Sequence, residues 1–281
     1  MNYPKISIVT PSYNQKDYLE QTIRSVIDQN YPNLEYVVMD GGSTDGSADV
    51  IRKYADRISY WVSEKDKGQY DAINKGFAHT TGEIMGWINS SDLLYPWTLH
   101  IVGEIFEQNP HISWIHGLPS NMSHGTAPQS VYNAPEKNIF DVLSGNYAGI
   151  QQESCFWRRS LWEKAGGALD INIRYAGDFN LWLKFFEHAE LYYVNTILGG
   201  FRFHDVRRGG YSTDHYGNEV KAVFKEYRGK ASAAQKMKAM TIKTLVGKSD
   251  MRSRALKKLK LFPWYRRRLI MYDFEKNRWV G

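Results

Sequence analysis

Short apolar runs alternate with helical repeats over the first 92 residues. The runs Ile6 to Thr10, Leu34 to Met39, Ile58 to Val62 and Glu83 to Ile88 have the length and composition of strands. Between them, apolar residues recur at helical spacing. These residues are Leu19, Ile23, Val26 and Ile27, then Val50, Ile51 and Tyr54, then several positions from Gln69 to Thr80. Strands that alternate with helices predict a parallel sheet with right-handed crossovers, and so an α/β fold.

Polar residues follow three of these strands, at 10–14, 40–42 and 89–92. In open α/β sheets, ligands bind beyond the carboxyl ends of the strands, so we expect these three loops to line one cleft. The run Asn89-Ser-Ser-Asp92 ends on a carboxylate, a hard oxygen ligand that suits Mg²⁺ or Mn²⁺ holding phosphate. The alternative is an ordinary polar turn, because Asn and Ser are common turn residues.

Asp40 ends the second strand and precedes a glycine-rich stretch, Gly41-Gly-Ser-Thr-Asp-Gly-Ser47. Its carboxylate can accept the N–H on the pairing edge of uracil, thymine or guanine, whereas neutral cytosine has no hydrogen there. The alternative is an Asx-type turn that opens the Gly-Gly bend. The glycine-rich stretch lacks the Lys-Ser/Thr ending of a P-loop and the spacing of a dinucleotide fingerprint.

The second half of the chain has weaker patterns. Apolar spacing predicts a helix over Pro96 to Phe106, and Trp114 to Gly117 is predicted as a short strand. Leu118 to Pro135 is rich in Ser, Asn, Gly and Pro, so we expect a mobile loop that covers a bound substrate. Asp178 precedes an amphipathic helix, and taken alone it is a candidate N-cap.

Composition divides the chain into an acidic body and a basic tail. The whole chain carries +6, and residues 221–281 hold 18 Lys and Arg against 4 Asp and Glu, a net +14, which leaves −8 for residues 1–220. The lone Cys155 is expected to be a buried structural thiol in a reducing compartment. No window approaches the roughly 18 consecutive apolar residues of a membrane span, and no signal region is visible, so we expect a cytoplasmic protein.

Four ordered motifs in residues 5–92 resemble the nucleotide-binding half of family 2 inverting glycosyltransferases, which have the GT-A fold. They are Ser7-Ile-Val-Thr-Pro-Ser-Tyr-Asn-Gln15, Asp40-Gly-Gly-Ser-Thr-Asp-Gly-Ser47, Lys67-Gly-Gln-Tyr-Asp-Ala-Ile-Asn-Lys-Gly76 and the cluster ending at Asp92. The resemblance implies a GT-A Rossmann-like mixed sheet flanked by helices. We therefore expect a glycosyltransferase domain over 1–220, with a nucleotide-binding half (1–95) and an acceptor and catalytic half (96–220), followed by a basic helical extension (221–281).

The resemblance also implies roles for individual residues. Nucleotide-binding residues would be Thr10, Pro11, Ser12, Asn14, Asp40, Asp71, Lys75, Asn89 and Ser91. Asp92 matches the position that binds Mn²⁺ or Mg²⁺, whereas Ser91 replaces a carboxylate that is expected to touch the ribose. A neutral hydrogen bond is roughly half as strong as a charged one. Fewer carboxylates also lower metal affinity.

In the second half, the resemblance implies that Asp178 is the general base, which takes the proton of an acceptor hydroxyl as it attacks the anomeric carbon and inverts its configuration. Similar enzymes carry an Arg-x-His motif near Arg202-Phe-His204. This motif implies that His204 approaches the metal or the diphosphate, and that the loop with Arg207 and Arg208 closes over it.

The predicted function is sugar transfer from a nucleoside-diphosphate sugar, with UDP or dTDP favoured, to a glycan or lipid-linked acceptor in cell-surface polysaccharide biosynthesis. The stretch Lys257 to Met271 interleaves cations with apolar groups, as in a helix lying on an anionic membrane at the inner face. Packing within the protein, contact between subunits and nucleic-acid binding are the alternatives for the tail. The alternatives for the function are a non-catalytic sugar-nucleotide-binding protein and a sugar nucleotidyltransferase. A processive polysaccharide synthase is disfavoured, since the chain lacks membrane spans and a Gln-x-x-Arg-Trp motif.

Overall fold

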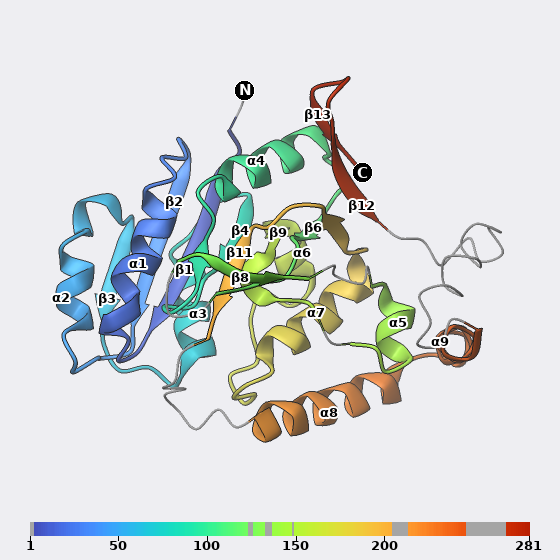
Figure 1. Cartoon of the computed structure of the whole chain (residues 1–281). Helices are drawn as coiled ribbons and strands as arrows, with labels where there is room; N and C mark the ends of the chain where they lie inside the picture. Colours follow the sequence, from blue (N-terminus) through green and yellow to red (C-terminus); the bar gives the residue numbers. More distant parts are fainter. Residues whose placement is uncertain (1–2, 123–125, 133–136, 148, 204–212, 246–267) are drawn as a thin grey trace.

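A large mixed sheet runs through the molecule (Figure 1). The computed structural model describes residues 3–122, 126–132, 137–147, 149–203, 213–245 and 268–281. The sheet has the strand order β13 (Arg278–Val280), β12 (Leu269–Asp273), β10 (Tyr192–Val194), β6 (Trp114–His116), β9 (Cys155–Arg158), β4 (Ile84–Trp87), β1 (Ile6–Ser12), β2 (Leu34–Asp40), β3 (Tyr60–Ser63). Strands β4, β1, β2 and β3 are parallel, as the sequence predicts. Antiparallel β9 joins them to the second half.

Helices cover both faces of this sheet. On one face lie α1 (Lys16–Ile27), α2 (Ser47–Arg52) and α4 (Thr98–Gln108), whose apolar residues share a core with Ile6 and Ile8 of β1. On the other lie α3 (Gln69–Ala78), α6 (Arg159–Lys164) and α7 (Gly177–His188), which pack around Val9. Alternate residues of β1 thus enter opposite cores, as expected for a strand buried on both faces.

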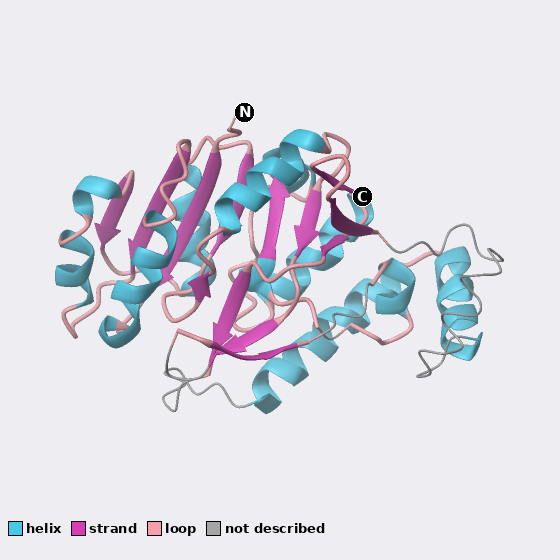
Figure 2. Ribbon diagram, turned by 45° about the horizontal axis from the view of Figure 1, so that its top comes forward, coloured by secondary structure: helices cyan, strands magenta, loops and turns pink. Residues whose placement is uncertain are grey.

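A smaller sheet lies below the large one in Figure 2. Its strand order is β5 (Leu93–Leu94), β11 (Gly199–Arg202), β7 (Ser120–Met122), β8 (Pro128–Val131). The expectation of a loop over 118–135 is therefore wrong for the residues of β7 and β8. These strands are short, and β7 is held by β11, some 80 positions further along the chain. Local sequence does not reveal such distant pairing.

The remaining elements connect the two sheets and form the end of the chain. They are the 3₁₀ turns η1 (Ala55–Arg57) and η2 (Gln152–Ser154), and the helices α5 (Ile139–Leu143), α8 (Thr213–Lys230) and α9 (Ala233–Leu245). The boundary expected at residue 220 falls inside α8, whose Val220 is buried with residues of α7. Helix α9 packs against α5. The first part of the tail therefore packs onto the body.

The last described residues form a β-hairpin, β12 and β13, rather than the helical extension that the sequence suggests. Strand β12 pairs in parallel with β10, and its Ile270 is fully buried in the main core. The helix expected over 257–271 is thus wrong for residues 269–271, and residues 257–267 lie outside the described residues. Across the described part of the chain, no helix combines the length and apolar character needed to span a bilayer.

Candidate active site

The carboxyl ends of β1 and β2 lie side by side, because Ser12 pairs in register with Asp40. Strand β4 flanks β1 on its other side and leads into the Asn89–Asp92 turn. The convergence of three strand ends that the sequence predicts is therefore present. The hydroxyl oxygen of Ser12 is buried and has no hydrogen-bond partner among the described residues.

Asp40 is buried and heavily hydrogen-bonded. Its carboxylate accepts from the Ser43 backbone N–H (2.9 Å), the Ser43 hydroxyl (2.5 Å) and the Ser63 hydroxyl (2.6 Å). The turn-forming alternative for Asp40 is thus seen in the structure. Its role in reading the base stays a prediction, since a carboxylate has about four lone-pair sites and three are used here.

The other residues of the first motif organise the loop. The Thr10 hydroxyl shares a hydrogen bond with the Tyr36 hydroxyl (2.9 Å) inside the core, and Pro11 is buried within β1. Asn14 lies in the left-handed region, with φ of 51°. Its backbone N–H donates to the Ser43 hydroxyl and its Oδ1 accepts from the Thr44 N–H. Asn14 therefore ties the loop after β1 to the loop after β2.

Helix α3 carries the next two predicted residues. Asp71 and Lys75 form an ion pair at 3.0 Å, four residues apart on one face of the helix, and Asp71 also accepts from the Lys67 N–H. Gln69 at the start of α3 donates to Asn89 Oδ1 (2.6 Å). This bond fixes α3 against the Asn89–Asp92 turn, in which Ser91 is half-buried.

Asp92 is almost fully buried, with 1% of its surface exposed. Its carboxylate accepts from the Arg202 N–H (3.0 Å) and from the Asn89 amide (3.2 Å). Burial raises the pKa of Asp92 to about 6, against the lowering effect of these bonds and of the Arg202 charge. Mg²⁺ is usually held by one or two carboxylates together with substrate phosphates, so this aspartate fits such an ion. Within the described ranges, no group of three or more His, Cys, Asp or Glu is arranged to hold a metal.

Asp178 lies in the first turn of α7 and does not cap it. The helix begins after Ala176, which makes no side-chain cap, and Asp178 Oδ1 accepts from the N–H of Phe179 (2.7 Å). Burial raises the pKa of Asp178 to about 6, although the residue as a whole is only half-buried. A carboxyl group with a raised pKa at a partly open position is suited to proton transfer near neutral pH.

Two other helices hold the segment before Asp178. Glu219 of α8 accepts from three consecutive backbone N–H groups, those of residues 174, 175 and 176, at 2.9, 2.6 and 2.7 Å. The Tyr70 hydroxyl of α3 donates to the Tyr175 carbonyl and accepts from the Gly177 N–H. A Cβ at Gly177 would lie 2.5 Å from the Tyr70 ring, so glycine permits this approach. One turn further along α7, Trp182 stacks on Trp87 of β4, with ring centroids 5.9 Å apart, and so packs the helix against the sheet.

Two residues outside the predicted site also reach this region. Arg202, at the end of β11, is 1% exposed, and none of its guanidinium nitrogens has a hydrogen-bond partner in the described chain. Glu153, in the turn before β9, is 3% exposed, and its Oε1 is likewise unpartnered there. The sequence offered a signal for Arg202, which begins the Arg-x-His motif, and none for Glu153. His204, Arg207 and Arg208 lie outside the described residues.

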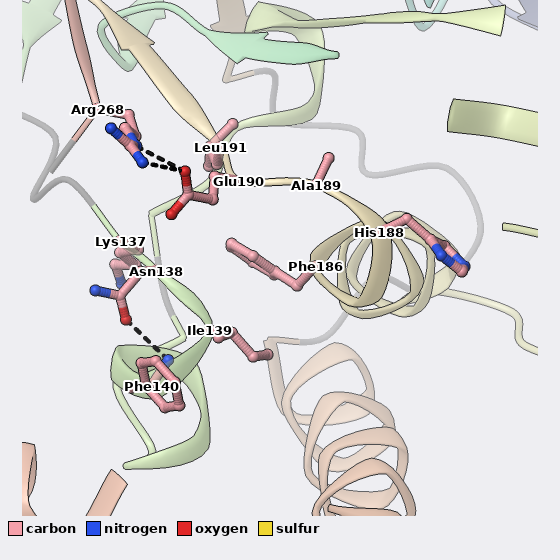
Figure 3. A pocket seen from close by; sticks show the side chains of 10 residues that line it. All are labelled: Lys137, Asn138, Ile139, Phe140, Phe186, His188, Ala189, Glu190, Leu191 and Arg268. Carbon is pink, nitrogen blue, oxygen red and sulfur yellow. Dashed lines mark hydrogen bonds and ion pairs between the residues drawn. The ribbon is translucent and has the colours of Figure 1, made fainter. Parts of the chain in front are cut away.

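A cavity of about 330 Å³ opens elsewhere, at the far end of α7 (Figure 3). Its lining includes Lys137, Phe140, Phe186 and Arg268, the last paired with Glu190. His188, at the end of α7, is ten residues from Asp178, which places them roughly 15 Å apart along the helix axis. The cavity contains none of the predicted site residues, and the strand ends remain the candidate active site.

Cys155 is confirmed as a buried free cysteine. Its Sγ lies 3.3 Å from the Gln151 carbonyl, and burial raises the pKa of the thiol well above its usual range. A protonated thiol in this setting is a poor nucleophile. Its role is therefore structural, as the sequence predicts.

Known proteins resemble this chain over most of its length. An uncharacterized glycosyltransferase of Rickettsia typhi is 27% identical over 213 residues, which is 73% of this chain and 65% of the relative. The putative teichuronic acid biosynthesis glycosyltransferase TuaG of Bacillus subtilis is 28% identical over 204 residues, 71% of this chain and 79% of the relative. The chain spans less than two thirds of the length of the Rickettsia typhi protein and of a similar one in Rickettsia prowazekii.

Solved structures share the fold. TarS of S. aureus (residues 1–349), in complex with UDP-GlcNAc, has a TM-score of 0.68 and 18% identity, covering 92% of this chain and 76% of that one. The mannosyltransferase PcManGT of Pyrobaculum calidifontis, in complex with GDP-Man and Mn²⁺, has a TM-score of 0.54 and 18% identity, covering 92% and 81%. The predicted GT-A fold is thereby confirmed. The model of the family described as glycosyl transferase family 2 matches residues 7–166, more than half of the chain, so the chain belongs to that family.

Proposed function

We propose that this chain is an inverting glycosyltransferase that moves a sugar from a nucleoside-diphosphate sugar to a glycan or lipid-linked acceptor. The observation that carries the proposal is the position of Asp178. It is a half-buried residue whose carboxyl group has a pKa raised to about 6, and Tyr70 and Glu219 hold the segment that carries it. Burial raises the pKa of Glu153, and the charges of Asp92 and Asp178 raise it further, which supports a site shared by the three acids.

The proposed reaction is a single displacement. Asp178 accepts the proton of the acceptor hydroxyl while that oxygen forms a bond to the anomeric carbon. The bond from this carbon to the diphosphate oxygen breaks on the opposite face, and the diphosphate leaves with the electron pair. A positioned base typically contributes about 10²–10⁴ in rate.

Charge builds on the leaving diphosphate, and two residues are placed to stabilise it. Asp92 would hold a divalent cation, which neutralises phosphate charge when bound. Arg202, whose guanidinium is buried without a partner in the described chain, would donate to the phosphate oxygens. Preorganised charges of this kind often supply the largest part of a rate enhancement.

For the nucleotide, we propose UDP or dTDP. The pairing edge of uracil or thymine offers an N–H to Asp40, and TarS, which shares the fold, is known in complex with UDP and with UDP-GlcNAc. Thr10, Pro11, Ser12, Asn14, Asp71, Lys75, Asn89 and Ser91 would line the nucleotide pocket.

For the acceptor, we propose a cell-surface polysaccharide precursor assembled at the cytoplasmic face of the membrane. The name of TuaG refers to teichuronic acid biosynthesis, and residues 221–281 carry a net +14. The β12–β13 hairpin also exposes Leu269, Met271 and Phe274, the last to 88%. Exposed apolar groups next to cations favour binding to anionic membranes.

The first test is calorimetric titration with UDP, dTDP, GDP and CDP, each with Mn²⁺ and with EDTA. We expect Mn²⁺-dependent binding of UDP or dTDP and no binding of CDP. Under the same conditions, turnover of a matching sugar nucleotide should release nucleoside diphosphate. Release of pyrophosphate would instead indicate the nucleotidyltransferase alternative, and binding without turnover of any acceptor tested would favour the non-catalytic one.

A further inference from the structure

Hydrogen bonds fix both ends of the η2 turn, whereas one carboxyl oxygen of its central residue has no hydrogen-bond partner in the described structure. Gln152 donates to the Trp87 carbonyl at the end of β4 (2.7 Å), and the Ser154 hydroxyl donates to the Gly199 carbonyl (3.0 Å). Glu153 between them is 3% exposed, and Oε1 has no partner in the described structure. A buried polar atom without a partner costs about 1–3 kcal/mol, so it calls for an explanation.

Backbone contacts place Glu153 next to the Asp92 turn. A Cβ at Gly199 would lie 2.1 Å from the Glu153 carbonyl oxygen, so β11 and η2 approach closely because residue 199 is glycine. The next residue of β11, Gly200, pairs with Leu93, which directly follows Asp92. Two residues further, the Arg202 N–H donates to Asp92.

The same carboxyl group is close enough to two proposed functional acids to be affected by their charges. The pKa of Glu153 is raised well above its usual range, first by burial and then by the charges of Asp92 and Asp178. These three acids come from the turn after β4, the turn before β9 and the start of α7. Glu153 therefore lies within electrostatic reach of both the diphosphate side and the acceptor side of the site.

Arg202 gives independent evidence that a ligand belongs here. Its guanidinium lies over the Tyr18 ring, 5.3 Å from the centroid, and is buried without a hydrogen-bond partner in the described chain. Buried charges are normally paired, so this arrangement is suited to an anionic ligand beside Asp92. The anionic group of a sugar nucleotide is its diphosphate.

We propose that Glu153 binds the sugar ring of the donor by hydrogen bonds to its hydroxyl groups, and so helps to select the sugar. The proposal rests on the proposed function. The anomeric carbon is bonded to the diphosphate, near Asp92 and Arg202, and is attacked by the acceptor oxygen held by Asp178. The ring that carries this carbon must lie near these groups, and Glu153 is close to the Asp92 turn and is affected by the charge of Asp178.

The chemistry of a buried carboxyl group suits this partner. A protonated carboxyl group both donates and accepts, and a sugar hydroxyl does the same. Burial favours this form of Glu153, whereas a metal ligand must be ionised. Sites built to hydrogen-bond a hydroxyl group reject analogues that lack it, because the buried polar group is then left unpaired.

The test compares UDP with a UDP-sugar, each in the presence of Mn²⁺, by calorimetry. The UDP-sugar used in the test is whichever of UDP-GlcNAc, UDP-glucose and UDP-galactose binds the wild-type protein most tightly. Glu153→Met removes both oxygens at similar volume. It should weaken binding of the sugar nucleotide roughly 10-fold to 100-fold and leave UDP binding unchanged. Glu153→Gln keeps a donor and an acceptor and should lose less.

The controls separate a ligand contact from a structural role. Glu163→Met, at an exposed position of α6, should change neither affinity. Because Glu153 Oε1 has no hydrogen-bond partner in the described structure, the melting temperature of the free Glu153→Met protein should stay close to that of the wild type, which shows that the variant folds.

Three results would overturn the inference. Equal losses for UDP and the sugar nucleotide would place Glu153 at the nucleotide or the metal. Unchanged affinity for both in Glu153→Met would show that it contacts no ligand. If the wild-type protein binds no nucleoside diphosphate and no sugar nucleotide, the proposed function fails, and this inference fails with it.

Discussion

Asp40 ends β2 and Asp92 lies in the turn after β4, on either side of β1; both are almost fully buried, yet their surroundings differ. Asp40 accepts three hydrogen bonds, all from two serines nearby. Asp92 accepts two, and around it Arg202 and Glu153 have polar atoms with no partner among the described residues. The comparison indicates that the protein itself holds the Asp40 carboxylate and leaves one lone-pair site for a base, whereas the region of Asp92 needs a ligand to complete it.

The largest expected effect on turnover is that of Asp178→Asn, at the start of α7. The amide keeps the shape and cannot take a proton, so kcat should fall about 10²–10⁴-fold while donor binding stays nearly unchanged. Steady-state kinetics with calorimetry measure the two quantities. Asp56→Asn, at an exposed position of η1, is the matched control and should behave as wild type. Turnover at the wild-type rate in Asp178→Asn would remove the assignment of the base.

The next largest expected effect is on UDP affinity and concerns Arg202. Arg202→Met should weaken UDP binding roughly 10-fold to 100-fold, because a charged hydrogen bond to phosphate is lost. The melting temperature of the free protein should fall little, since the guanidinium donates no hydrogen bond in the described chain and loses only its contact with the Tyr18 ring and its attraction to Asp92. Arg52→Met, at an exposed residue of α2 that pairs with Asp49, is the control. Unchanged UDP affinity in Arg202→Met would mean that the guanidinium does not meet the diphosphate.

The pH dependence of turnover should report the raised pKa of Asp178, about 6. The base acts when ionised, so the rate at saturating donor should level off above pH 6 and fall about tenfold per unit below it. Asp92 also has a raised pKa, so donor binding must be measured at each pH. A loss of donor binding at low pH can then be told apart from a loss of the base. A rate that stays flat from pH 7 to pH 5 at saturating donor would contradict this prediction.

The smallest effect tests the comparison itself, through stability without ligand. Asp40→Asn replaces a carboxylate oxygen by an NH₂ group facing serine donors, and should lower the free energy of unfolding by about 1–3 kcal/mol. Asp92→Asn removes a buried carboxyl group whose pKa is raised by burial, so its loss of stability should be smaller. Urea unfolding of both variants measures the difference. A larger loss for Asp92→Asn would reverse the comparison.

The first half of the fold was predictable because each strand and helix there has a local signature. Runs such as Tyr36 to Met39 are continuous and apolar, and β1 pairs in parallel with β2, as the alternation of strands and helices predicts. The smaller sheet was missed because its strands have two to four residues, and because β11 finds its partners β5 and β7 far along the chain. The β12–β13 hairpin was missed for the same reason, since β12 pairs with β10.

The candidate site was predictable in part. Asp40, Asp92 and Asp178 stand out because a carboxylate follows an apolar run or precedes a helix in a recognisable motif. Glu153 lies in Gln-Gln-Glu-Ser, a run in which the sequence singles out no functional residue. Its burial and the absence of a hydrogen-bond partner for Oε1 in the described chain are seen only in the structure. Glu219 is also invisible in sequence, because its three hydrogen bonds join α8 to a segment more than 40 residues earlier.

The Glu219 contact limits how this architecture can be recombined. The segment that carries Asp178 is held by a side chain from α8, which lies beyond residue 166, where the match to the family model ends. A hybrid enzyme that takes its donor half from one relative and its remainder from another must therefore inherit α7 and α8 from the same parent. Exchanging them separately would leave three backbone N–H groups without their acceptor and release the base from its place.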